Sequence, residues 1–253
     1  MKKFLAVILF AFIALGAFAG GAKDKNSNPD FIASTSWTAA FADLAGIDDV
    51  SCIAPASLRH PPEYEITVSD IQKITESKYF IYAGFERMMQ TLGNSVGTVQ
   101  MVKISCDNSI ATVKKNAALL SEITGTQEES AKRVAAYENA ILTAARQLEE
   151  LGLKGAPVLC NANQVYLAKD LGLTVAATFG PGPVTATQIA DAKVGNYVFI
   201  IDNVHNPVGQ PLAEVAPKSK YVIWRNFPER TERNALLNVI KENINTLLSS
   251  YKK

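Results

Sequence analysis

Short apolar segments alternate along this chain with longer segments whose apolar residues recur every three or four positions. A short unbroken apolar run predicts a buried strand, and spacing of three to four predicts a helix that buries one face. The strands that we predict lie at residues 31–35, 50–54, 79–82, 157–160, 173–178, 197–201 and 220–224. Helices between such strands predict parallel sheets, because the chain must cross back before each new strand begins.

The predicted helices are marked by their spacing and by end signals. They lie at residues 37–44, around 71–74, at 126–151, 166–171, 186–192 and 212–215, and at the end of the chain. Two of them open on what resembles a capping box, at residues 67–70 and 126–129. The second box begins the longest helix, whose apolar stripe includes Tyr137 and Ile141 and which ends at Gly152.

These elements predict an α/β protein of two Rossmann-like lobes, each with a parallel sheet, joined by one long backbone helix. We place the first lobe at residues 30–125, the linking helix at 126–152 and the second lobe at 153–253. Open α/β sheets bind ligands outside the carboxyl ends of their strands, so facing lobes predict a ligand cleft between them. A single rigid linking helix also predicts that the lobes move little against each other.

The first nineteen residues have the pattern of a signal peptide. Lys2 and Lys3 precede an apolar run at residues 4–18, and the Ala-Phe-Ala sequence at 17–19 fits the small-x-small pattern of a cleavage site. The run is short for a membrane span, although an uncleaved anchor is the alternative. The first cysteine is Cys52, so no thiol is placed for a lipid anchor. We predict a soluble periplasmic protein cleaved near Ala19.

Charge and composition narrow the classes of function. The chain has 25 basic and 24 acidic residues and a net charge of +1, so no overall field attracts nucleic acid or a membrane. Its three cysteines make at most one disulfide within the chain, which excludes a disulfide scaffold. We find no Ser/His/Asp set, no phosphate-binding glycine loop and no paired carboxylates at catalytic spacing. We therefore expect a binding protein and not an enzyme, and we expect a monomer.

Several segments, in their order and spacing, resemble the zinc/manganese solute-binding proteins of ABC transporters. The most specific runs from Tyr64 and Glu65 to Asp70 and is similar to that family's Tyr-Glu-x-Thr-x-Ser-Asp segment. Residues 161–173 resemble the family's second-lobe motif, which ends in Tyr-Gly-Leu. The resemblance covers nearly the whole mature chain. It implies an ABC permease in the inner membrane as the partner, and zinc or manganese as the transported ligand.

The resemblance also implies four positions for metal ligands, and here they hold mostly residues that do not bind metals. The family's first histidine falls at Pro62, so His60, two positions earlier, is the candidate first-lobe ligand. The other three positions fall, in order, at Lys103, at Asn161, and at Arg225 or Asn226. Ammonium and guanidinium groups repel a divalent cation, so other side chains must complete the shell.

Carboxylates and thiolates are the alternatives for completing a metal site. Glu63 and Glu65 are the carboxylates nearest in sequence to the candidate histidine. Cys52, Cys106 and Cys160 could instead supply thiolates for zinc or cuprous copper, although no C-x-x-C spacing supports this. The cysteines could also be buried as small apolar side chains, or Cys52 and Cys106 could form a disulfide.

The remaining candidates suggest other roles. Lys103, Asn161 and Arg225 together would make a cationic pocket suited to a carboxylate or another anion. Trp37 could line the cleft or pack under the neighbouring loop. His205 lies in an Asp-Asn-Val-His-Asn-Pro segment, where we expect a structural role in an Asx turn.

We therefore predict the periplasmic solute-binding subunit of an ABC importer, of the zinc/manganese uptake type but with altered ligands. One alternative is a binding protein for a non-metal ligand or for a chelate such as a siderophore or cobalamin. Another is a degenerate member that has lost its ligand and acts as an interaction protein. The polarity and the width of the cleft would separate a bare metal ion from a larger ligand.

Overall fold

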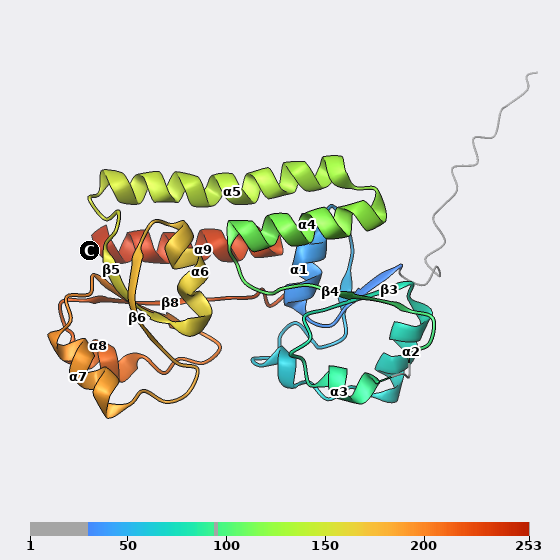
Figure 1. The fold of residues 1–253 in the computed structure, drawn as a ribbon, viewed down its shortest axis with the longest axis horizontal. Helices are drawn as coiled ribbons and strands as arrows, with labels where there is room; N and C mark the ends of the chain where they lie inside the picture. Colours follow the sequence, from blue (N-terminus) through green and yellow to red (C-terminus); the bar gives the residue numbers. More distant parts are fainter. Residues whose placement is uncertain (1–29, 94–95, 253) are drawn as a thin grey trace, which may run out of the picture.

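The computed structural model describes residues 30–93 and 96–252, and these contain two four-stranded sheets with helices around them (Figure 1). The first sheet has the order β2-β1-β3-β4 and consists of β1 (Phe31–Ala33), β2 (Ser51–Cys52), β3 (Tyr79–Tyr82) and β4 (Gln100–Lys103). The second has the order β6-β5-β7-β8 and consists of β5 (Pro157–Asn161), β6 (Thr174–Phe179), β7 (Phe199–Asn203) and β8 (Lys220–Trp224). All the paired strands are parallel, as the alternation of strands and helices predicts.

The helices either flank one sheet or run across both. Beside the first sheet are α1 (Ser36–Leu44), α2 (Val68–Glu76), α3 (Met88–Leu92) and α4 (Ile110–Thr124), and beside the second are α6 (Val165–Asp170), α7 (Ala186–Val194) and α8 (Gln210–Val215). The long helix α5 (Gln127–Glu150) runs from the first half to the second, with α4 and the closing helix α9 (Ala235–Lys252) beneath it (Figure 1). Short 3₁₀ turns cover Pro61–Glu63 and Ala162–Gln164. The fold is therefore the predicted pair of α/β lobes joined by one long helix; the residue at which each lobe ends stays a prediction.

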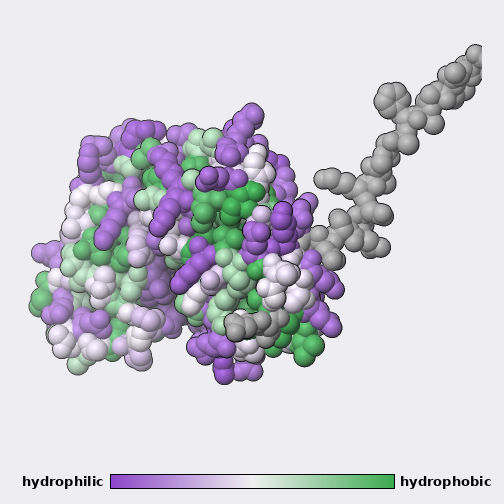
Figure 2. Space-filling model, turned by 45° about the vertical axis from the view of Figure 1, so that its right-hand side comes forward, coloured by the Kyte–Doolittle hydropathy of each residue, from purple (hydrophilic) through white to green (hydrophobic). Residues whose placement is uncertain are grey.

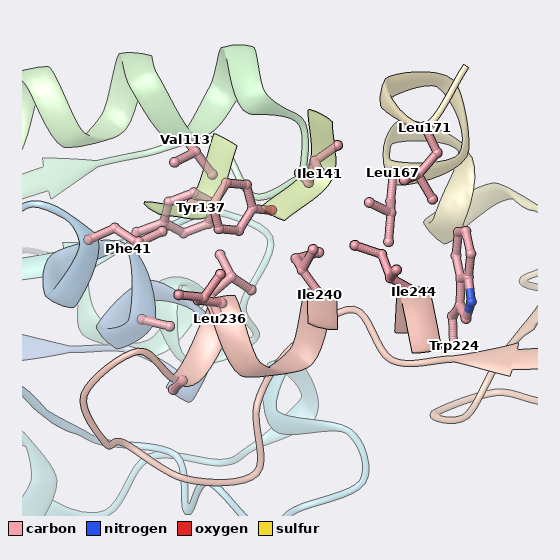
Figure 3. Close-up of a cluster of buried hydrophobic side chains, with 14 of the residues drawn as sticks. Phe41, Val113, Tyr137, Ile141, Leu167, Leu171, Trp224, Leu236, Ile240 and Ile244 are labelled. Atoms are coloured by element: carbon pink, nitrogen blue, oxygen red, sulfur yellow. The ribbon is translucent and has the colours of Figure 1, made fainter. Parts of the chain in front are cut away.

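One continuous apolar core connects the lobes. Phe41 and Val113 come from the first lobe, Leu167 and Trp224 from the second, and Tyr137 of α5 lies between them (Figure 3). Side chains of α9 continue the row from one lobe to the other in the same view, with Leu236, Ile240 and Ile244 labelled (Figure 3). Smaller clusters cover the outer face of each sheet. Because the shared core is closely packed, relative motion of the lobes would disrupt it.

A second connection runs back from β8 to the first lobe before α9 begins. Ser36 Oγ donates a hydrogen bond to the carbonyl oxygen of Pro228 at 2.6 Å, and Asn234 N donates to Asp43 Oδ2 at 2.9 Å. In this way residues 225–234 contact α1, and α9 then returns along α5. The sequence predicts one linking helix, and the structure adds this segment as a second tie.

The structure corrects several local predictions. The first two strands are shorter than residues 31–35 and 50–54, and α3, β4 and α4 were not predicted. The capping box predicted at residues 126–129 is wrong: Thr126 makes no side-chain cap, and its hydroxyl donates to the carbonyl oxygen of Ala45 at 2.6 Å. The box at Thr67 is confirmed, since Thr67 Oγ1 accepts from Asp70 N and the Asp70 carboxylate accepts from Thr67 N.

The N-terminal segment is not part of this description. The predicted signal peptide, residues 1–19, lies outside the described residues. Within residues 30–93 and 96–252, no helix combines the length and the apolar character that crossing a membrane would need.

Candidate ligand-binding cleft

A cavity of about 410 Å³ lies where the carboxyl ends of the two sheets face each other. Its lining comes from the segment that follows each of the strands β1 to β8, or from the last residue of the strand. The lining residues are Trp37, His60, Pro62, Glu63, Phe85, Cys106, Asn163, Pro181, Asn203, His205, Asn206, Asn226 and Phe227. In the space-filling view the two lobes are rounded masses that meet along an indented seam (Figure 2). The cleft that open α/β sheets predict is therefore present, with walls from both lobes.

The lining is mostly uncharged. Glu63 is its carboxylate, and the lining contains no lysine or arginine. Four asparagines supply amide groups, and Trp37, Phe85 and Phe227 supply aromatic surface. Such a wall suits a small ligand with its own polar groups, because amides both donate and accept hydrogen bonds.

Two of the predicted candidates, Trp37 and His60, line the cavity. Trp37 Nε1 donates to Asn108 Oδ1 at 3.0 Å, and its ring lies 5.9 Å from the ring of Phe227, so first-lobe and second-lobe side chains meet there. His60 is exposed just before the Pro61–Glu63 turn. The turn places Glu63 on the same cavity as His60.

The other candidates lie elsewhere. Glu65 is exposed and pairs with Arg87 at 2.9 Å, and Lys103 lines a hollow beside α4 that adjoins the cavity and shares Phe85 and Cys106 with it. Arg225 pairs with Glu229 and lines a third hollow, whereas its neighbour Asn226 lines the cavity. Asn161 is fully buried behind the cavity wall. Lys103, Asn161 and Arg225 therefore do not line the cavity, and the cationic pocket that they would make together stays an untested alternative.

His205 takes a larger part in the cavity wall than its sequence suggests. Its backbone nitrogen donates to Asn203 Oδ1 at 3.3 Å, which is the expected Asx turn, but its ring also stacks on Phe227 with 3.6 Å between centroids. Burial and then the charge of Arg225 lower the pKa of His205 to about 4, so the ring is neutral at pH 7. Its Nε2 atom is buried without a hydrogen-bond partner, and so is Asn226 Oδ1.

The sequence contained a signal for these residues. His205 follows β7, and Asn226 and Phe227 follow β8, so all three lie at carboxyl ends of strands. Applied to both lobes, the rule for open α/β sheets places them in the cleft.

A buried carboxylate supports each half of the wall. Asp202, at β7, accepts hydrogen bonds from Asn161 Nδ2, Asn203 N, Gly209 N and Tyr221 Oη, at 3.0, 2.7, 2.7 and 2.8 Å. Glu86, in the first lobe, accepts from Ser34 Oγ, Ala83 N and Gly84 N at 2.5, 2.8 and 2.6 Å. Because these oxygens are already satisfied inside their own lobes, both carboxylates position loops and neither is free to bind a cation.

The cysteines carry no thiolate site. All three are free, so the structure contains no Cys52–Cys106 disulfide. Burial raises the pKa of Cys52 to about 11 and that of Cys160 to about 12, and it raises the pKa of Cys106 well above its usual value, so the thiols are protonated at pH 7 in the metal-free protein. Across residues 30–93 and 96–252, no group of three or more His, Cys, Asp or Glu side chains could hold a metal ion.

Comparison with known proteins finds similarity at the level of structure. No family model matches the sequence, and no curated protein matches it. The laminin-binding protein Lmb of Streptococcus agalactiae, described as a bifunctional protein with adhesin and metal-transporting activity, is similar with a TM-score of 0.68 at 13% identity, over 87% of this chain and 98% of that one. The solute-binding protein FpvC of Pseudomonas aeruginosa, in complex with Ni²⁺, has a TM-score of 0.66 at 14% identity, over 88% and 97%.

A third solved structure extends the comparison. The Mn-bound periplasmic metal-binding protein of Candidatus Liberibacter asiaticus has a TM-score of 0.62 at 14% identity, over 87% of this chain and 98% of that one. All three similarities extend over nearly the full length of the other chain. The protein therefore has the two-lobed fold of these metal-binding proteins.

Proposed function

We propose that this protein is the periplasmic solute-binding subunit of an ABC importer, of the metal-uptake type but with altered ligands. The observation that carries the proposal is the cavity itself, which loops from the carboxyl ends of both sheets enclose between two tied lobes. A solute bound there would be contacted by both lobes, and clefts of this kind are where small ligands bind. Similarity of fold to proteins that bind Ni²⁺ and Mn²⁺ supports a metal as the class of cargo.

Within this proposal the cargo is zinc or manganese, and His60 is the first-lobe ligand. A neutral imidazole is a good ligand for both ions, and His60 is exposed at the cavity. Glu63 is the nearest carboxylate on the same wall, whereas Glu65 points to Arg87 outside it. The metal shell of this protein would therefore differ from the four positions that the sequence resemblance implies.

The size of the cavity argues against the largest alternatives. Cavities for small ligands measure about 300–1,000 Å³. At about 410 Å³ the cavity lies toward the small end of that range. A cobalamin or a large siderophore would need far more room, and the tied lobes leave little scope for the cleft to widen.

Uptake by cells tests this function. Deleting the gene should lower accumulation of radioactive zinc or manganese from limiting medium. A wild-type copy should restore accumulation, a His60→Ala copy should not, and a Glu65→Ala copy is the matched control, because Glu65 is exposed and lies outside the cavity. Unchanged accumulation of both metals in the deletion strain would refute a role in metal import.

Export belongs to the same proposal. A signal peptide cleaved after Ala19 leaves a mature chain that begins near Gly20, without a lipid and, we propose, as a monomer. The intact mass of the protein from the periplasmic fraction checks this, and a mass that includes residues 1–19 in the membrane fraction would contradict it.

A further inference from the structure

The donors at the cavity are too scattered for a bare metal ion. Zn²⁺ normally keeps at least three protein ligands at about 2.0–2.3 Å. The histidines, the carboxylate and the thiol that line this cavity do not form such a set. Closure of the cleft would not assemble a set of metal ligands, because the two lobes are already joined. Asn108 Nδ2 of the first lobe donates to the carbonyl oxygen of Asn226 at 2.9 Å, and the packed core continues from one lobe to the other.

The charge of the lining points the same way. A divalent ion in this cleft needs negative charge beside it, since an unbalanced charge that is removed from water is unfavourable. Glu63 is the carboxylate of the lining, and it is exposed. Glu86 and Asp202 lie behind the wall and already accept hydrogen bonds from their own lobes. A metal ion whose charge is already neutralised by the carboxylates of a small chelator would not need the carboxylates of Glu63, Glu86 or Asp202.

The rest of the wall matches such a partner. Asn163 and Asn206 present amide groups at the cavity, which suit the carboxylates and amines of a small organic molecule, although Asn206 Nδ2 also donates to the carbonyl oxygen of Pro181; Asn203 and Asn226 line the wall but are buried. Within this wall, the buried atoms His205 Nε2 and Asn226 Oδ1 have no hydrogen-bond partner. Buried polar atoms are almost always paired, so a bound water at these two atoms would complete the network inside the wall.

Aromatic side chains supply the apolar part of the wall. Phe85 is 55% exposed and lines both the cavity and the adjoining hollow beside α4. Trp37 and Phe227, from different lobes, also line the cavity, and their rings lie 5.9 Å apart. These rings add contact area for an organic ligand, and a bare hydrated ion would gain nothing from them.

We propose that the cargo is a chelate, that is, a divalent metal already bound by a small aminocarboxylate; this inference rests on the proposed import function. His60 occupies one open coordination position of the metal. The His60 imidazole replaces a metal-bound water, the asparagine amides bind the carboxylates of the chelator, and Phe85 and Trp37 cover its carbon atoms. The cavity volume of about 410 Å³ accommodates a complex of this size.

Calorimetric titration of the metal-free mature protein tests the proposal. The probes are Zn²⁺ alone, iminodiacetate alone, histidine alone, and the 1:1 zinc complexes of iminodiacetate, which is neutral, and of histidine, which carries a charge of +1. Each complex leaves a coordination position open. We expect at least one complex to bind at least tenfold more tightly than Zn²⁺ or the free chelators. Zn²⁺ binding as tightly as both complexes would overturn the chelate proposal and leave metal import standing. A free chelator binding as tightly as its complex would overturn it as well.

Variants distinguish binding of the complex in the cavity from binding of its metal to the exposed His60 imidazole alone. His60→Ala should weaken the preferred complex at least tenfold. Phe85→Ala should weaken it several-fold although it removes no metal ligand, and its melting temperature should stay unchanged because Phe85 is exposed. Glu65→Ala is the control and should bind like the wild type. Full binding by Phe85→Ala would mean that the complex contacts only the imidazole and would overturn the cavity as its site. Absence of binding by any probe would refute both the chelate proposal and zinc as the cargo.

Discussion

Asp202 is the residue on which the second-lobe wall of the cavity depends. It is fully buried, and its two carboxylate oxygens accept four hydrogen bonds, from β5, β7, β8 and the loop before α8. Gly209 allows this close approach, because a Cβ there would lie 2.8 Å from Phe179 Cζ and 3.0 Å from Asp202 Oδ2. The loop that carries His205 runs between these two points and takes its position from both.

We expect Asp202→Asn to lower the free energy of unfolding by about 2–4 kcal/mol. In the variant, the new NH₂ group would face groups that are themselves hydrogen-bond donors. A buried polar group left unpaired costs about 1–3 kcal/mol, and the cost is larger where the lost hydrogen bonds were made to a charged group. Urea unfolding of the purified variant measures the change. Asp191→Asn, at an exposed position in α7, is the control and should stay within about 0.5 kcal/mol of the wild type. An Asp202→Asn protein as stable as that control would contradict the role given to Asp202.

His205 makes stability depend on pH. Its folded pKa of about 4 lies below the unfolded value of 6.5, so the unfolded state binds a proton first. The contribution of His205 is therefore fully present above about pH 6.5 and is lost as the pH falls toward about 4. We expect a decrease of about 2–3 kcal/mol across this window. Unfolding at several pH values checks it, and in His205→Gln this part of the decrease should vanish; an identical pH profile would refute it.

At this scale the sequence predicts part of the site. His60 and Trp37 follow first-lobe strands, and the structure places both on the cavity. Lys103 and Asn161 also lie at strand ends, yet one points to another hollow and the other is buried. The direction of a side chain at the end of a strand depends on what packs behind it. The position of a residue in the sequence predicts that it lies at the carboxyl edge of the sheet. It does not predict which cavity, if any, its side chain lines.

Among the elements, α5 is fixed to the first lobe by one buried arginine. Arg133 Nη1 donates to Asp43 Oδ1 at 2.8 Å, Nη2 donates to Asp48 Oδ1 at 2.7 Å, and Nε donates to Glu129 Oε1 at 2.9 Å. The Asp43 carboxylate also accepts from Asn234 N, just before α9. Burial raises the pKa of Asp43, which the hydrogen bond from Asn234 and the charge of Arg133 oppose. One ion network therefore joins α1, α5 and the start of α9.

We expect Arg133→Met to lower the free energy of unfolding by about 3–5 kcal/mol, because it leaves the buried Asp43 carboxylate without its cation. The next residue offers a matched control: Lys132 is exposed and pairs with Glu128 on the same helix, so Lys132→Ala should change stability by less than about 0.5 kcal/mol. Thermal and urea unfolding measure both. If the two variants lost equal stability, the Arg133 network would contribute no more to stability than the exposed Lys132–Glu128 ion pair.

Elements with strong local signals are predictable, and those made by tertiary contacts are not. The periodicity of α5 and the run that forms β8 carry their own pattern, and both are confirmed. In contrast, β4 is an edge strand with mostly exposed side chains, and α3 has only five residues, so neither has a clear period. Thr126 resembles an N-cap in sequence, but its hydroxyl donates to the carbonyl oxygen of Ala45, just after α1, and no local pattern reveals this contact.

For the whole molecule, the shared core predicts a stiff pair of lobes. Its side chains come from both sheets and from α5 and α9 (Figure 3). A rotation of one lobe would have to break that packing, so ligand binding should cause only a small closure. A globular chain of this size has a radius of gyration of about 17 Å. We expect the ligand to change it by less than about 1 Å in solution scattering of the mature protein, and a larger compaction would contradict the shared core.

The same core should make the two lobes unfold together, although each has its own sheet. The two tryptophans of the chain report on this, because Trp37 belongs to the first lobe and Trp224 is buried in the second. The Trp37→Phe variant keeps only Trp224, so its fluorescence reports unfolding of the second lobe. The Trp224→Phe variant keeps only Trp37, so its fluorescence reports unfolding of the first lobe. Circular dichroism reports unfolding of the whole molecule. We expect the fluorescence and dichroism midpoints in urea to coincide within each variant.

Ile240 tests what couples the lobes. It is fully buried in α9, within the row of side chains that continues from one lobe to the other. Ile240→Ala leaves a cavity there and should cost about 2–5 kcal/mol. If the core is shared, this cost lowers the midpoint seen by either tryptophan equally, whereas Val68→Ala, at a position 75% exposed, should move neither. Separate transitions for the two tryptophans, or a shift confined to one of them, would mean that the lobes are independent domains and that the long helix connects them without coupling them.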